Sequence, residues 1–193
     1  MDTGGQPIGP YVASDGAVWV SNYDGTLERV DPATNAVAAR VDLGGMAEAT
    51  TEAFGRVWST NQDGTLSGVD PATATRAVGP VTVSRDVDDV AALPDGLWVS
   101  TFYAGLVAKV DPQSGAILAR VQLPGQGSGL LAAAGSLWAS VYNAGQVVRI
   151  DPVSGKIVAT YDAGVEPRAL AFDGTAVWVV DEGSNLVSRI AVG

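Results

Sequence analysis

The sequence predicts an all-β protein, a five-bladed β-propeller, and three observations carry the prediction. The five tryptophans of the 193-residue chain lie in one register, with successive intervals of 39, 40, 40 and 40 residues. An Asp-Pro pair follows each of the first four tryptophans after 12 or 13 residues. Between these markers, short alternating or β-branched runs are separated by turn residues, and no stretch shows the 3.6-residue period of a helix. Repeats of about 40 residues with four antiparallel strands each are typical of propeller blades.

The first repeat shows why four strands are expected. Its runs are separated by Asp15-Gly16, by a turn at residues 23–25 and by a turn at residues 31–35. Asp-Gly suits a tight hairpin because glycine tolerates a positive φ, and proline presets φ for the third turn. The expected strands are residues 10–14, 17–21, 26–30 and 37–43.

The third turn contains one irregularity. Its last position is Asn35 in the first repeat and glycine in the third and fourth, all residues that accept a left-handed backbone. The second repeat has Ala74 there instead. We therefore expect either mild strain at Ala74 or a different turn.

The repeats divide a single domain at about residues 6–45, 46–84, 85–124, 125–164 and 165–193. The last blade is expected to lack its outermost strand, so residues 186–190 would form an exposed edge that invites self-association. Three arrangements fit: a closed ring with one three-stranded blade, a fragment of a larger propeller, or an assembly whose partners cover the gap. We favour the closed ring.

Charge and composition exclude several classes of function. The net charge of -10 repels phosphate backbones and anionic lipids, so neither nucleic acid nor membrane insertion is expected. The chain has no cysteine and no histidine, which removes thiol nucleophiles and the usual neutral-pH general base. The first residues do not form a signal peptide. We expect an extracytoplasmic or secreted setting in a bacterial parent protein, with any leader outside this sequence.

A binding site is expected at the end of the propeller that carries the second turn of each repeat and the links between repeats, because these loops vary from copy to copy. The residue after the proline position, at the start of the innermost strand, would surround the channel mouth. In chain order these residues are Ile8, Glu48, Asp88, Ser128 and Arg168. The charged members could bind a cation, clamp a polar ligand or pair with one another.

A rim of aromatic and amide side chains is expected beside this mouth. It comprises Tyr23, Phe102 and Tyr142, with Asn22 and Asn61 preceding two of the equivalent positions. Rings offer flat apolar area and amides offer hydrogen bonds, which suits a sugar or a peptide. The alternative is that the rings fill gaps between blades. If a metal binds, the candidates are Glu48, Asp88 and Asp181.

The run from Pro167 to Val180, followed by Ser188-Arg189-Ile190, resembles the YVTN and virginiamycin B lyase-like (NHL-like) propeller repeats. The resemblance covers essentially the whole chain and implies a propeller fold. The lyases of that family use a histidine and a magnesium ion at the channel mouth, and this chain has no histidine. Gluconolactonases of similar architecture hold calcium or zinc with Glu, Asn and Asp, a set of oxygen ligands that this chain could supply.

Three hypotheses for function follow. The first is a non-enzymatic binding or scaffold propeller that recognises a small polar ligand or a protein, without a cofactor. The second is a metal-dependent lyase or lactonase-type hydrolase that uses Glu48 and Asp88 around a divalent cation. The third is a propeller fragment or an engineered chain without activity of its own.

Overall fold

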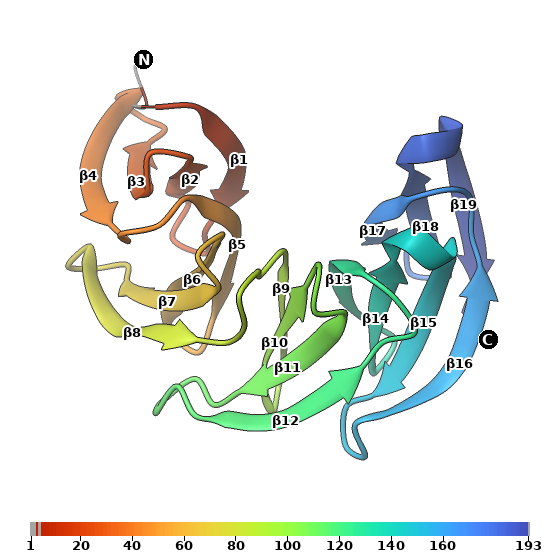
Figure 1. Cartoon of the computed structure of the whole chain (residues 1–193). Helices are drawn as coiled ribbons and strands as arrows, with labels where there is room; N and C mark the ends of the chain where they lie inside the picture. The colour runs from red at the N-terminus through yellow and green to blue at the C-terminus, as the bar shows by residue number, and fades with distance from the viewer. Residues whose placement is uncertain (1–2, 4, 193) are drawn as a thin grey trace.

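The computed structural model describes residue 3 and residues 5–192, and it contains five antiparallel sheets that follow one another along the chain (Figure 1). We call these sheets blades one to five. The first four have four strands each and the fifth has three, as the repeats predict. Within each blade the strands lie side by side in chain order.

Blade one comprises β1 (Pro7–Val12), β2 (Val18–Asn22), β3 (Thr26–Asp31) and β4 (Ala36–Asp42). Blade two comprises β5 (Ala47–Ala53), β6 (Arg56–Asn61), β7 (Thr65–Asp70) and β8 (Thr75–Thr82). Blade three comprises β9 (Val90–Leu93), β10 (Gly96–Thr101), β11 (Leu106–Val110) and β12 (Ile117–Gln122). Blade four comprises β13 (Gly127–Ala133), β14 (Ser136–Val141), β15 (Gln146–Asp151) and β16 (Lys156–Asp162). Blade five comprises β17 (Pro167–Phe172), β18 (Ala176–Asp181) and β19 (Leu186–Ala191). Two short 3-10 helices, Tyr142–Ala144 and Glu182–Ser184, form the turns after β14 and β18.

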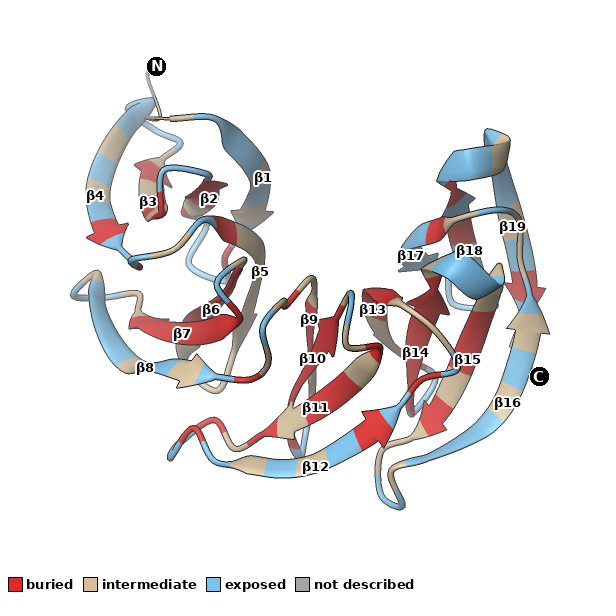
Figure 2. Ribbon diagram, viewed as in Figure 1, coloured by how far each residue is buried: buried red, intermediate tan, exposed pale blue. Residues whose placement is uncertain are grey.

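The blades are arranged as an arc with the first strand of each blade on the inner side (Figure 1). The fourth strands β4, β8, β12 and β16 lie on the outside and alternate between exposed and more buried residues (Figure 2). Blade one and blade five stand apart at the two ends of the arc (Figure 1). The architecture is therefore propeller-like, and the closed ring favoured by the sequence is not confirmed.

The tryptophans hold consecutive blades together. Trp19 of blade one packs with Val57 and Val69 of blade two in one buried cluster. Trp58, Trp98 and Trp138 occupy equivalent clusters at the next three junctions, and all four tryptophans are fully buried. Each tryptophan thus faces the blade that follows it. Burying so large an aromatic side chain contributes several kcal/mol to each junction, roughly 3 to 5 by the cost of truncation to alanine.

A hydroxyl group two residues after each of these tryptophans adds a second link between blades. In every case it donates a hydrogen bond to a backbone carbonyl at the start of the next blade's inner strand or, for Asp88, just before it. The bonds are Ser21 to Glu48 at 2.7 Å, Thr60 to Asp88 at 3.2 Å, Ser100 to Ser128 at 2.6 Å and Ser140 to Arg168 at 2.8 Å. The four accepting residues are four of the five expected at the channel mouth. The fold therefore fixes the backbone of these candidate site residues directly.

Blade five differs because, among the residues that the structure describes, no further sheet packs on its outer face. Val177 and Val179 of β18 are buried against blade four, whereas Trp178 and Val180 on the opposite face are 37% and 47% exposed. Val180 stands where the other blades have the linking hydroxyl. The guanidinium of Arg189 lies 5.7 Å from the centroid of the Trp178 ring and covers part of it.

Candidate functional site at the inner end of the arc

All five residues expected at the channel mouth line one open cavity of about 250 Å³, which we call the axial cavity. Ile8, Glu48, Asp88, Ser128 and Arg168 each come from a different blade. Their convergence follows from the repeat, because each occupies the same position at the start of an inner strand.

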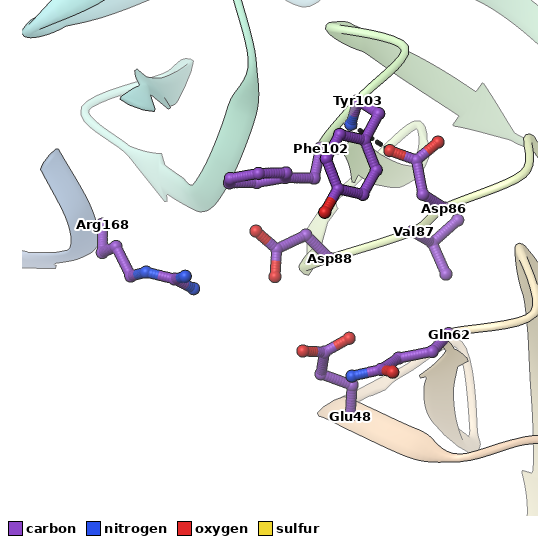
Figure 3. A pocket seen from close by; sticks show the side chains of 8 residues that line it. All are labelled: Glu48, Gln62, Asp86, Val87, Asp88, Phe102, Tyr103 and Arg168. Atoms are coloured by element: carbon purple, nitrogen blue, oxygen red, sulfur yellow. Dashed lines mark hydrogen bonds between the residues drawn. The ribbon is translucent and has the colours of Figure 1, made fainter. Parts of the chain in front are cut away.

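A second cavity of about 250 Å³ adjoins the first, and we call it the aromatic cavity (Figure 3). It is lined by Glu48, Gln62, Asp86, Val87, Asp88, Phe102, Tyr103 and Arg168. Figure 3 shows the Arg168 side chain directed across the cavity toward Asp88, with Glu48 and Gln62 on the opposite wall. The two cavities share Glu48, Asp88 and Arg168.

The acidic wall is built by an irregular segment in blade three. Strand β9 begins only at Val90, so Asp88 and Asp89 precede it in a segment without regular secondary structure. The Asp89 carboxylate accepts hydrogen bonds of 2.8 Å from the backbone N–H groups of Val90 and Leu130. Asp89 therefore ties blade three to blade four and leaves its neighbour Asp88 facing the cavity.

Asp86 has a different task in the same segment. Its carboxylate accepts hydrogen bonds from the backbone N–H groups of Tyr103 and Ala104, the latter at 3.3 Å. These bonds hold the turn that carries Phe102 and Tyr103. The two rings meet edge to face, with centroids 5.1 Å apart and an interplanar angle of 89°.

Glu48 has an unusual protonation equilibrium. Burial raises the pKa of its carboxyl group to about 7, and the charge of Asp88 adds to this effect. The Gln62 amide and the Arg168 guanidinium act in the opposite direction but do not cancel it. Glu48 is thus poised to gain or lose a proton near neutral pH.

The neighbouring carboxyl groups shift in the same direction. Burial raises the pKa of Asp88, against the opposing influence of Ser128 and Arg168. Burial also raises the pKa of Asp89 to about 6, although the two backbone hydrogen bonds to its carboxylate counteract the shift. The three neighbouring carboxyl groups at the site therefore all have raised pKa values.

Arg168 is the cation of the site, and it already forms an ion pair with Glu182. Its Nε lies 2.7 Å from a Glu182 carboxylate oxygen. Its guanidinium also lies over the rings of Phe102 and Tyr142, at 5.8 and 5.3 Å from their centroids. Tyr142 thus supports the site through Arg168 and through its contact with Phe102, whose centroid is 5.1 Å away.

The other expected site residues are placed elsewhere. Asn22 and Asn61 are fully buried, and their amides donate to Thr26 and Thr65 across their own turns, at 3.1 and 2.9 Å. Tyr23 is partly exposed but lines neither cavity. Asp181 is fully buried and accepts a 2.5 Å hydrogen bond from Ser188, so it also lies outside both cavities.

The structure adds residues that the sequence did not single out for the aromatic cavity. Tyr103 completes the aromatic corner, and the Gln62 amide lies beside Glu48 (Figure 3). Gln62 shares the repeat position of Phe102, four residues after a tryptophan, so the register could have placed it. Tyr103 had no such signal, because it lies one residue beyond that position.

The described part of the chain contains no cluster of three or more acidic side chains with the geometry of a metal site. Glu48 and Asp88 are two oxygen donors with the Gln62 amide nearby, fewer charged ligands than calcium sites in proteins generally use.

No protein-family model matches the chain, and no curated protein sequence is significantly similar to it. Within the residues that the structure describes, no helix is long and apolar enough to cross a membrane.

Proposed function

We propose that this chain is a non-enzymatic binding protein that holds a small polar ligand in the aromatic cavity. One observation carries the proposal: Glu48, Asp88 and Arg168, from three different blades, converge on a space bordered by Phe102 and Tyr103. A concave site with convergent polar groups and perturbed carboxyl groups is the usual form of a small-molecule site.

The size of the cavity limits the ligand. A volume of about 250 Å³ lies just below the usual range of ligand pockets, roughly 300 to 1,000 Å³, so the ligand should be small. The aromatic and axial cavities share Glu48, Asp88 and Arg168, so a somewhat larger ligand that contacts these side chains would extend toward the axial cavity.

A repeat protein offers a clean control for testing this proposal. Phe102 and Tyr23 occupy equivalent positions four residues after Trp98 and Trp19, but only Phe102 lines the cavity. We would screen small sugars, amino acids, amines and carboxylic acids by two-dimensional amide NMR of the ¹⁵N-labelled protein. Compounds that bind should shift Glu48, Gln62, Asp88 and Tyr103, and the shifts should vanish in Phe102→Ala but persist in Tyr23→Ala.

Two outcomes of that screen would refute the proposal. One is that no compound perturbs these residues at millimolar concentration. The other is that a compound which binds is converted to a product, seen as new ¹H resonances during incubation. Conversion would favour a hydrolase or lyase, in which Glu48 and Asp88 would act as the acid and base.

A further inference from the structure

The charges around the aromatic cavity are unbalanced. Three carboxylate residues line it against a single cation, Arg168. Because Arg168 is paired with Glu182, its charge is already largely compensated. Of the ion pairs found among the described residues, none includes Glu48 or Asp88. Two carboxyl groups of the cavity therefore have no cation in contact.

Asp88 also has an unsatisfied oxygen. Its Oδ2 atom is buried and has no hydrogen-bond partner. A buried acceptor without a partner costs roughly 1 to 3 kcal/mol, more when the group is charged. A ligand with an N–H donor at this point would remove that cost. A positively charged donor would in addition stabilise the ionised form of the Asp88 carboxyl group.

The aromatic corner favours the same kind of ligand. The Tyr103 side chain is largely exposed, with 75% of its surface accessible, and stands at a right angle to Phe102. The face of an aromatic ring attracts cations by roughly 0.5 to 2 kcal/mol, depending on how far the site is desolvated. The Phe102 face is partly taken by Arg168, whereas the Tyr103 ring carries no such cation among the contacts found.

We propose that the ligand of the aromatic cavity is a small organic cation, an amine or a guanidinium compound, bound by Glu48 and Asp88 beside the ring of Tyr103. The inference rests on the proposed binding function and specifies its ligand class. The net charge of -10 adds to the attraction by raising the concentration of cations near the surface.

Binding of a cation should be coupled to proton release. The free protein holds a proton at Glu48 below a pH of about 7, because of burial and Asp88, while Asp89 raises and Arg168 and Gln62 lower the pKa. A cation favours the ionised carboxylates of Glu48 and Asp88. Affinity should therefore rise as the pH increases from 5.5 to 8, and protons should be released on binding.

The experiment compares three probes of similar shape by calorimetry: benzylammonium, benzyl alcohol and benzoate. Benzylammonium should bind at least about tenfold more tightly than benzyl alcohol, as expected for a hydrogen bond to a charged group, and benzoate more weakly still. Asp88→Asn and Glu48→Gln should each weaken benzylammonium by about tenfold or more. Asp162→Asn removes the same charge at an exposed position outside the cavity and should leave the affinity nearly unchanged.

The outcomes separate the two proposals. If benzyl alcohol or benzoate binds in the cavity as tightly as benzylammonium, the ligand class is wrong while the binding function stands. If benzylammonium fails to bind at millimolar concentration, or binds equally well to Asp88→Asn and Glu48→Gln, the inference of a cationic ligand is overturned. The broader screen then decides the binding function by itself. Thermal unfolding of each variant shows that it is folded.

Discussion

Ala74 occupies a left-handed backbone position, with a φ of 50°, at the end of the turn between β7 and β8. Asn35, Gly115 and Gly155 hold the same place in the other four-stranded blades, with φ values of 53°, 74° and 65°. The turn hydrogen bond from the Ala74 N–H to the Asp70 carbonyl, 2.9 Å, matches those of Gly115 and Gly155. The turn therefore keeps its shape, and Ala74 adopts the left-handed conformation from which strain is expected.

Replacing Ala74 with glycine should stabilise the protein by up to about 1 kcal/mol. The change removes a left-handed penalty of roughly 1 to 2 kcal/mol, which is partly offset by the greater freedom of glycine in the unfolded chain. Equilibrium unfolding in urea would measure the difference. Ala72→Gly in the same turn, where φ is not positive, is the control and should not stabilise. Equal effects of the two changes would contradict this account.

At the scale of the elements, the second strand of each blade carries the tryptophan that joins it to the next. Four of these tryptophans lie between two sheets, while Trp178 has a sheet on one side only. Its indole N–H donates to the Asp173 carboxylate at 2.7 Å, within its own blade, as those of Trp58 and Trp138 donate to carbonyls of theirs. The same residue type thus has two energetic roles in one chain.

Truncation should expose this difference. Trp58→Ala should lower the free energy of unfolding by about 3 to 5 kcal/mol, since it leaves a cavity between two packed blades. Trp178→Ala should cost clearly less, because a large part of the ring is already exposed to water. Urea unfolding followed by circular dichroism would compare them. Similar losses would mean that the open face of blade five is covered in solution, for example by a second copy.

At the scale of the whole molecule, the inner end concentrates carboxyl groups that resist ionisation. Glu48, Asp88 and Asp89 have raised pKa values, so between about pH 4 and pH 7 the folded protein binds more protons than the unfolded chain. Stability therefore falls as the pH rises through this range. The exposed aspartates whose pKa values are lowered, such as Asp31 and Asp111, change stability only at more acidic pH.

The protein should consequently melt at a higher temperature at pH 5 than at pH 8. In a Glu48→Gln/Asp88→Asn double variant the difference should shrink, because neither replacement ionises. Differential scanning calorimetry at the two pH values is the measurement. Asp162→Asn serves as the control for general charge repulsion and should keep the pH dependence of the unmodified protein. An undiminished difference in the double variant would place its source elsewhere.

Much of this arrangement could be predicted from the sequence because residues at equivalent positions of a repeat take equivalent places in successive blades. The tryptophan spacing predicted five sheets, the short fifth repeat predicted the missing outer strand, and the shared register predicted that Glu48, Asp88 and Arg168 would meet. Closure could not be predicted, since the angle between blades depends on how side chains pack at each junction. Asn22 and Asn61 looked like ligand amides because a pattern does not show burial. The place of Tyr103 in the cavity could not be predicted, because it depends on a loop that Asp86 holds through a hydrogen bond, and no sequence motif indicates this contact.

The hydroxyl groups that link the blades donate to backbone carbonyls, so these bonds do not involve the side chains of the accepting residues. Glutamate, aspartate, serine and arginine all occupy this repeat position, and the backbone carbonyl of each accepts the equivalent hydrogen bond. Because these bonds use only the backbone of the accepting residue, side chains of different size and charge are compatible with the same link between blades. The chain can therefore differ from blade to blade in what it presents to a ligand while the bonds that join the blades stay constant.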